Sequence, residues 1–178
     1  MAMTHRAYPF DYGLFSQTFK PVLLDALDSG SAVLLAQFID ENYRQLRSPY
    51  DGSPVFSGWR KLFDASDVQV CGDVAMTKFY DPMRDIGLGG DWIEISECLC
   101  GVCPGLQGSS PVLGQVIGRT VLFDPGRMGS YFQDISSLKS SLRCIDTIGD
   151  AISATSFAQV RSMLEEAIES GPGLFVSF

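Results

Sequence analysis

Three cysteines stand close together in this chain, at Cys98, Cys100 and Cys103, in the pattern C-x-C-x₂-C. Thiolates at such short spacing can hold zinc in a tetrahedral site. A fourth ligand would then have to come from Cys71, Cys144 or His5. Structural zinc sites normally combine two short motifs, and this chain contains one. Free cysteines are also common as small buried residues, so a metal or redox site stays open beside a plain packing role.

Redox chemistry at the same cysteines would need a stabilised thiolate. Nearby positive charge or a helix N-terminus stabilises a thiolate. Glu94 and Glu97 lie just before Cys98, the first cysteine of the cluster, and would instead raise a thiol pKa. The residue after Cys103 is Pro104, and the sequence there does not indicate a helix. We therefore expect no cofactor, and a cysteine-based metal-binding or redox domain remains the alternative function.

His5 is the only histidine, and it stands near the N-terminus, where chains are often frayed. Catalytic triads and most acid–base sites rely on a histidine. Paired carboxylates could replace it, but Glu94 and Glu97 fall on opposite faces if their segment is a strand. The sequence therefore does not predict an enzyme.

The carboxylates are unevenly distributed along the chain. The segment 64–97 holds eight of them against two cations, which accounts for −6 of the net charge of −8 in 34 of the 178 residues. The following segment, 98–143, has two carboxylates and four cations. An acidic surface attracts basic proteins and repels the phosphate backbone of nucleic acids. The imbalance favours a basic protein partner and argues against nucleic acid.

The elements that must position these residues begin with helices. Apolar residues recur at helical spacing after Phe19, Pro21 suits the first turn, and Gly30 ends the run. Ser31 is expected to cap a second helix with one apolar face. The segment 48–58, rich in Pro, Gly and Ser, is then a loop.

The middle of the chain has the composition of strands. β-Branched residues and alternating polarity predict strands over 68–71, 74–80, 92–100 and 116–123. The last of these runs into Asp124-Pro125-Gly126, a turn sequence in which proline fixes φ and glycine permits a positive φ.

The C-terminal third predicts two helices and a strand. The segment 136–145 has helical spacing, and a longer helix begins at the capping box formed by Ser156 and Gln159. Gly171 ends that helix, and 173–178 reads as a terminal strand. The order of elements favours an α+β fold with N-terminal helices, a central antiparallel or mixed sheet, a C-terminal helix and a terminal strand.

Length and composition predict a single globular domain over residues 1–178. The chain is 46% hydrophobic, which is enough apolar material for a core. No apolar run approaches the roughly 20 residues needed to cross a bilayer. Five cysteines, an odd number, indicate reduced thiols more than disulfide staples. We expect a cytoplasmic protein without a membrane segment, and its oligomeric state does not follow from the sequence.

In its overall profile the chain resembles bacterial toxin-immunity proteins. The resemblance is carried by a small acidic chain poor in catalytic residues and by the acidic run DPMRDIGLGGDWIEISE at 81–97. It implies a protein that is not an enzyme and that binds and neutralises a basic enzyme, such as a cognate toxin. A subunit of a larger assembly is a further alternative. The expected contact residues are Asp81, Asp85, Asp91, Trp92 and Glu94.

Overall fold

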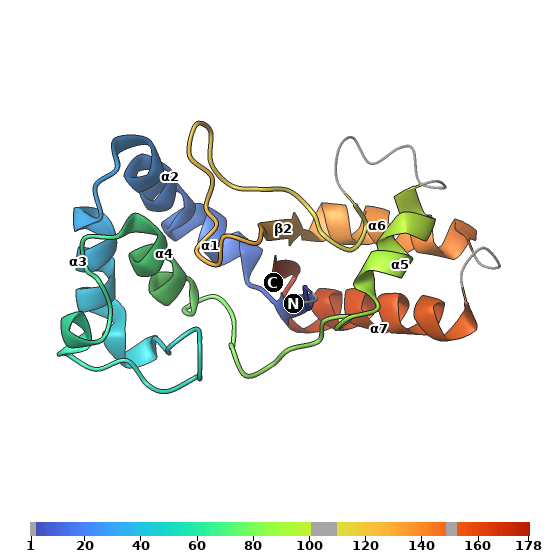
Figure 1. The fold of residues 1–178 in the computed structure, drawn as a ribbon, viewed down its shortest axis with the longest axis horizontal. Coiled ribbons are helices and arrows are strands. Elements are labelled where there is room, and N and C mark those ends of the chain that lie inside the picture. The colour runs from blue at the N-terminus through green and yellow to red at the C-terminus, as the bar shows by residue number, and fades with distance from the viewer. Residues whose placement is uncertain (1–2, 101–109, 149–152) are drawn as a thin grey trace.

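The structure is a computed structural model that describes residues 3–100, 110–148 and 153–178. Within these ranges, seven α-helices flank a three-stranded antiparallel sheet, which makes an α+β fold (Figure 1). The elements are β1 (Arg6–Pro9), α1 (Tyr12–Thr18), α2 (Lys20–Ser29), α3 (Val33–Asn42), η1 (Tyr43–Gln45), η2 (Trp59–Lys61), α4 (Val68–Met76), α5 (Trp92–Cys100), β2 (Ser130–Asp134), α6 (Ile135–Ile148), α7 (Ala154–Ser170) and β3 (Gly173–Ser177). Among the described residues, no helix is both long and apolar enough to cross a membrane.

The sheet brings the first and last elements of the chain together. β3 is the central strand and pairs antiparallel with β1 on one side and β2 on the other. Phe175 of β3 lies opposite Tyr8 of β1 and opposite Phe132 of β2. The two ends of the chain consequently lie near each other at the middle of the molecule (Figure 1).

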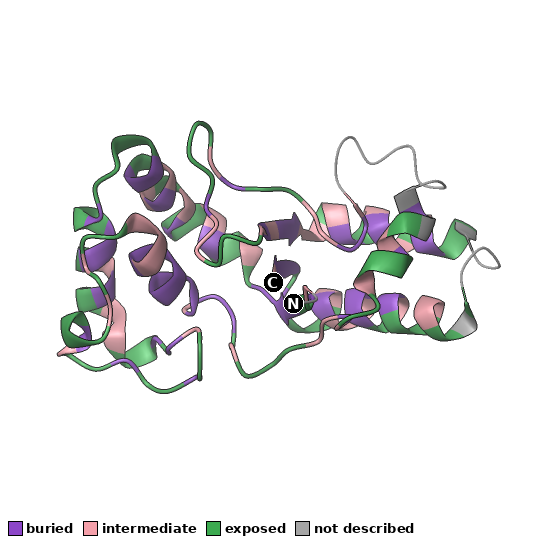
Figure 2. Cartoon of the chain, viewed as in Figure 1, coloured by how far each residue is buried: buried purple, intermediate pink, exposed green. Residues whose placement is uncertain are grey.

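The sheet separates two hydrophobic clusters, because successive side chains of a strand point to opposite faces. Phe175 belongs to a cluster formed with α1 to α4, whereas Leu174 and Val176 belong to a cluster formed with α5 to α7. Figure 1 shows the same division, with α2, α3 and α4 toward one end of the molecule and α5, α6 and α7 toward the other. The helices bury the sides that face these clusters and expose the others (Figure 2).

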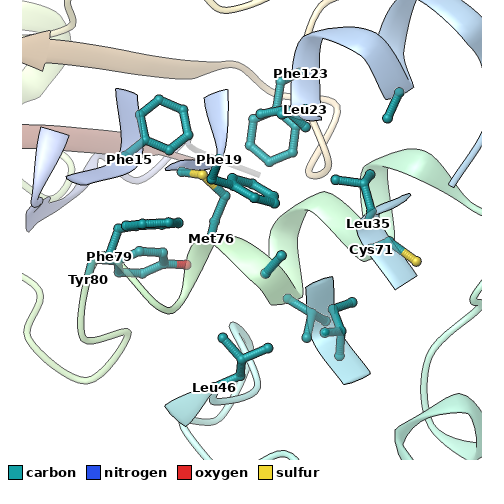
Figure 3. Close-up of a cluster of buried hydrophobic side chains, with 14 of the residues drawn as sticks. Phe15, Phe19, Leu23, Leu35, Leu46, Cys71, Met76, Phe79, Tyr80 and Phe123 are labelled. Atoms are coloured by element: carbon teal, nitrogen blue, oxygen red, sulfur yellow. The ribbon is translucent and has the colours of Figure 1, made fainter. Parts of the chain in front are cut away.

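The first cluster is rich in aromatic rings and is built around α4. Phe15 stacks parallel to Phe132 with 5.8 Å between ring centroids. Phe123, from the segment before β2, is also fully buried here, and Figure 3 shows it beside side chains of the N-terminal helices. Every residue of α4 from Cys71 to Met76 is buried. α4 is therefore enclosed on most of its surface.

The predicted helices at both ends of the chain are confirmed. Pro21 lies in the first turn of α2, and Gly30 ends that helix in the left-handed conformation. The segment 48–58 is a loop, and α6 covers 136–145. Gly171 follows the last residue of α7, and β3 comes directly afterwards.

The expected helix caps are displaced along the chain. α3 begins after Ala32 rather than after Ser31, and no side chain caps it. Ser153 caps α7 by accepting the backbone N–H of Ser156, so this helix begins nearly one turn before the predicted capping box. The local sequence pattern thus predicted that both helices exist, but it predicted the wrong first residue for each.

The strands predicted over 68–71 and 74–80 are wrong, because this region forms α4 and the turn after it. The valines suggested a strand. However, Asp67 accepts the backbone N–H groups of Gln69 and Val70, which is the hydrogen bonding of a helix N-cap. Burial against α3 and the aromatic cluster then outweighs the weak strand preference of β-branched residues.

The strand predicted over 116–123 is also absent from the described sheet. This segment and its neighbour contribute two isolated bridges, Gln115–Phe132 and Gly118–Leu122. The turn at 124–126 is present, but the positive φ of 57° falls on Arg127 rather than on the glycine. The neighbouring sheet strand is β2, which the sequence analysis did not predict.

The segment 92–100 forms α5 rather than a strand. Ile95 and Leu99, four residues apart, are both buried in the second cluster. In a segment this short, the same apolar positions fit both a helical and a strand period. The correction matters for function, because a helix brings different carboxylates together than a strand does.

Candidate functional site

The sequence suggested that His5 lies in a frayed terminus. In the structure it is instead buried beside the sheet. Its Nε2 donates to the carbonyl of Val112 at 2.8 Å, and the N–H of Leu88 donates to its Nδ1 at 3.2 Å. A neutral imidazole satisfies both contacts, and burial lowers the pKa of His5. The ring also packs near Trp92 and Phe178. His5 therefore joins separate segments of the chain and has no nitrogen free for a metal.

The cysteine cluster lies only partly within the described residues. Cys98 and Cys100 belong to α5, but their side chains, and Cys103 altogether, lie outside the described part. Cys71 is a buried free thiol in the first cluster, and burial raises its pKa to about 11. Cys144 is disulfide-bonded, so the expectation of five reduced thiols is wrong. Within the described ranges no group of three His, Cys, Asp or Glu side chains could hold a metal.

Two of the expected contact residues, Asp81 and Asp85, accept local backbone hydrogen bonds. Asp81 Oδ1 accepts the N–H of Met83 at 3.0 Å in an exposed turn. Asp85 Oδ1 accepts the N–H of Ala7 at 3.1 Å and that of Gly87 at 2.9 Å, which ties its segment to β1. Asp81 also lines a groove of about 340 Å³ together with three cations, Arg47, Lys78 and Arg84. Both carboxylates thus have structural roles, and Asp81 has cations nearby.

Trp92 is half-buried at the start of α5 and is held in place by the ends of the chain. Its indole Nε1 donates to the carbonyl of Met3 at 3.0 Å. Its ring lies 4.7 Å from that of Phe178, measured between centroids. Trp92 therefore anchors α5 to the sheet region.

Asp91 and Glu94 are exposed at the first turn of α5, and Glu97 is exposed one turn further on. The N–H of Ile95 donates to the carbonyl of Asp91, so Asp91 already belongs to the helical turn. Glu94 and Glu97, three residues apart, share one exposed side of α5, whereas Ile95 and Leu99 share the buried side. Asp91 precedes the helix and is exposed next to its first turn. Asp91, Glu94 and Glu97 together form what we call the α5 acidic face.

The α5 acidic face is not neutralised from within the described chain. None of its three carboxylates makes an ion pair or side-chain hydrogen bond with a described residue. The ion pairs of the described chain use five other carboxylates: Asp28, Asp40, Asp146, Glu165 and Glu166. Of the eight carboxylates in 64–97, none is paired with a described cation. The charge imbalance seen in the sequence therefore persists in the fold.

Asp73, another carboxylate of the acidic segment, lies inside the molecule on α4, with 8% of the residue exposed. It lines a cavity of about 190 Å³ between α4, the sheet and the loops on either side. Three tyrosines and one arginine line the same cavity: Tyr8, Tyr50, Tyr80 and Arg6. No described residue makes a hydrogen bond or an ion pair with the Asp73 carboxyl group.

Burial dominates the electrostatics of this cavity. It raises the pKa of Asp73 to about 7, so that the group is partly protonated at neutral pH. Burial, with the nearby Asp73 carboxylate, also raises the pKa of Tyr80 and of Tyr50 above their usual value. The charge of Asp73 thus acts on the hydroxyl groups of two tyrosines that line the same cavity.

Sequence reasoning missed Asp73 and Glu97 because it assigned strands where the chain forms helices. Asp73 is the only charged residue in the segment VQVCGDVAM, and a single carboxylate within an apolar helix is the signal that could have identified it. Glu97 was set apart from Glu94 because residues three apart point to opposite faces of a strand.

Comparison with protein families, curated proteins and solved structures gives no match. The function of the chain has to be inferred from its own residues.

Proposed function

We propose that this chain is an interaction protein that binds a basic protein and neutralises it, and that it is not an enzyme. The resemblance to bacterial toxin-immunity proteins suggests a cognate toxin as the partner, with an enzyme acting on an anionic substrate as the best fit. The observation that carries the proposal is the α5 acidic face, whose three exposed carboxylates have no cation among the described residues.

Unpaired carboxylates on one side of a helix suit a cationic partner for a physical reason. Like charges on neighbouring helical positions repel each other, which lowers helix stability slightly. A partner with lysines or arginines would relieve this repulsion and be attracted from a distance of about 10 Å at moderate salt. Such complementarity raises the association rate and rejects acidic competitors.

The other expected contact residues act in this proposal mainly by positioning the acidic face. Trp92 anchors the N-terminus of α5 through the carbonyl of Met3. Asp85 ties the preceding segment to β1. Asp91 and Glu94 remain the proposed contact residues, and Glu97 joins them.

The expectation of a cytoplasmic location depended on reduced thiols. Because Cys144 is disulfide-bonded, that support is lost. Disulfides persist mainly in oxidising compartments. The proposal therefore concerns the charge of the partner and does not depend on a reducing compartment.

The test is to purify the tagged chain from the cell in which it occurs, alongside the double variant Asp91→Lys/Glu94→Lys. A matched control is Asp25→Lys/Glu41→Lys, which makes the same change in net charge at exposed acidic positions of α2 and α3. We expect a basic protein at one-to-one stoichiometry with the wild type and the control. The α5 variant should lose it, and adding the purified wild type should abolish the activity of the recovered partner.

Three results would reject the proposal. The first is recovery of no basic partner at fixed stoichiometry. The second is equal retention of that partner by the α5 variant and the control. The third is a partner whose activity the purified chain leaves unchanged.

A further inference from the structure

The cavity around Asp73 combines a deeply buried carboxyl group with an opening to the surface. Asp73 has 8% of its surface exposed and has no partner among the described residues. Leaving such a group unpaired is costly, since buried polar groups are normally hydrogen-bonded and buried charges are normally paired. Among the described residues no fully buried side-chain oxygen lacks a partner, so the Asp73 oxygens are open to the cavity, where water or a bound group has to supply their hydrogen bonds.

The walls of the cavity are aromatic. Tyr8 and Tyr80 are buried, with 4.9 Å between their ring centroids, and Tyr80 lies 5.1 Å from Phe175. Tyr80 stands at the edge of the aromatic cluster drawn in Figure 3. Tyr50, by contrast, is 69% exposed and forms the outer rim. A carboxylate surrounded by tyrosines is a favourable setting for an organic cation, because the faces of aromatic rings attract positive charge.

We propose that the Asp73 cavity binds the guanidinium group of an arginine side chain or of a small molecule. A guanidinium is planar, forms two hydrogen bonds with one carboxylate and stacks on tyrosine rings. It is also more weakly hydrated than an ammonium, so that it enters a dry site more readily. The volume of about 190 Å³ holds such a head group and part of its alkyl arm, and is below the roughly 300 Å³ at which pockets for drug-sized ligands begin.

The chain's own cation in the cavity does not satisfy Asp73. Arg6 lines the cavity from β1, but its charge acts on the hydroxyl of Tyr8 and it makes no ion pair with Asp73. The pKa values of the three tyrosines are raised above their usual value, so their hydroxyl groups stay uncharged near neutral pH. Asp73 is thus the group in the cavity whose charge responds to a bound cation near pH 7.

The direct test is titration of the purified chain with methylguanidinium chloride at constant ionic strength, followed by NMR of the backbone amides of Gly126, Gly129 and Ser130. These residues line the cavity. N-methylurea, which has a similar shape and no charge, is the matched probe. We expect saturable shifts with methylguanidinium and none with N-methylurea. Asp73→Asn should weaken binding about tenfold or more, the size expected for one charged hydrogen-bonded pair, while the exposed control Asp25→Asn should bind as the wild type does.

A measurement on the wild type covers the case in which Asp73→Asn does not fold. Protonation removes the negative charge, so methylguanidinium affinity should fall when the pH is lowered below the pKa of about 7. The proposal is overturned by shifts that do not saturate, by equal shifts with N-methylurea, or by an affinity that Asp73→Asn and low pH leave unchanged.

The source of the guanidinium is decided by repeating the titration on the complex with a recovered partner. Loss of methylguanidinium binding in the complex is the result expected if an arginine of the partner fills the cavity. Persistent binding rejects that source and leaves a small guanidinium compound as the occupant. The inference does not depend on the proposed function, because the free chain is tested with a defined probe and without the α5 variants.

Discussion

Two buried titratable residues, Asp73 and His5, respond to pH in opposite directions. Burial raises the pKa of Asp73 from 3.8 to about 7 and lowers the pKa of His5 from 6.5. The unfolded chain therefore binds fewer protons than the folded chain at Asp73 and more at His5. Stability falls with rising pH between about 4 and 7 on account of Asp73, and it falls with decreasing pH below about 6.5 on account of His5.

Replacing Asp73 with asparagine isolates its contribution. The variant cannot ionise at this position, so it should be more stable than the wild type above pH 7, and the difference should vanish toward pH 4. A pKa raised from 3.8 to about 7 corresponds to a difference of up to about 4 kcal/mol in the free energy of unfolding. Urea unfolding of both proteins across this pH range measures it. A difference that does not change with pH would show that Asp73 titrates normally in the folded chain.

At the scale of elements, the position of a helix terminus or turn depends on individual hydrogen bonds, and the sequence indicates only some of them. Pro21 and Gly30 gave the bounds of α2 because each acts through its own backbone. α4 was mistaken for strands because its valines prefer strands weakly, whereas its helical state depends on the Asp67 cap and on burial against distant residues. A short stretch of sequence does not show which distant residues will pack against it.

The residues of the proposed sites also depend on packing between distant segments. The sequence predicted the acidic character of 81–97 and the exposed positions of Asp91 and Glu94. It did not predict Glu97 or Asp73, because their placement depends on α5 and α4 being helices. β1 and β2 were also missed, since each is short and is defined by pairing with β3.

The connection between β1 and the segment before α5 gives a prediction at this scale. Asp85 accepts two backbone N–H groups, from Ala7 and Gly87, and a Cβ at Gly87 would lie 2.3 Å from the carbonyl oxygen of His5. Asp85→Ala should lower the free energy of unfolding by about 1–2 kcal/mol, because both donors lose their acceptor. Asp85→Asn keeps an acceptor oxygen and should cost less. Thermal or urea unfolding of the two variants makes the comparison.

The structural role of Asp85 would be contradicted if Asp85→Ala left the free energy of unfolding unchanged and lost a basic partner. Asp85 would then be a contact residue, as the sequence suggested, and its hydrogen bonds to β1 would be unimportant for the fold.

At the scale of the whole molecule, the sheet holds two clusters together, and the carboxylates of 64–97 are divided between the two halves, with Asp67 at α4 and Glu94 on α5. β3 contributes Phe175 to one cluster and Leu174 and Val176 to the other, so the two halves share a single strand. The arginines that form ion pairs in the described chain, Arg84 of the acidic segment included, all pair with carboxylates outside 64–97. The exposed carboxylates of the α5 acidic face therefore stay unpaired within the described chain.

The most direct test of the proposed function is the association rate constant between the chain and its recovered basic partner, measured by stopped-flow at low and at high salt. We expect a fast, strongly salt-dependent association that slows about tenfold or more in Asp91→Lys/Glu94→Lys and much less in Asp25→Lys/Glu41→Lys. An association rate that is insensitive to salt, or equally reduced in both variants, would contradict the claim that the α5 acidic face docks a cationic protein.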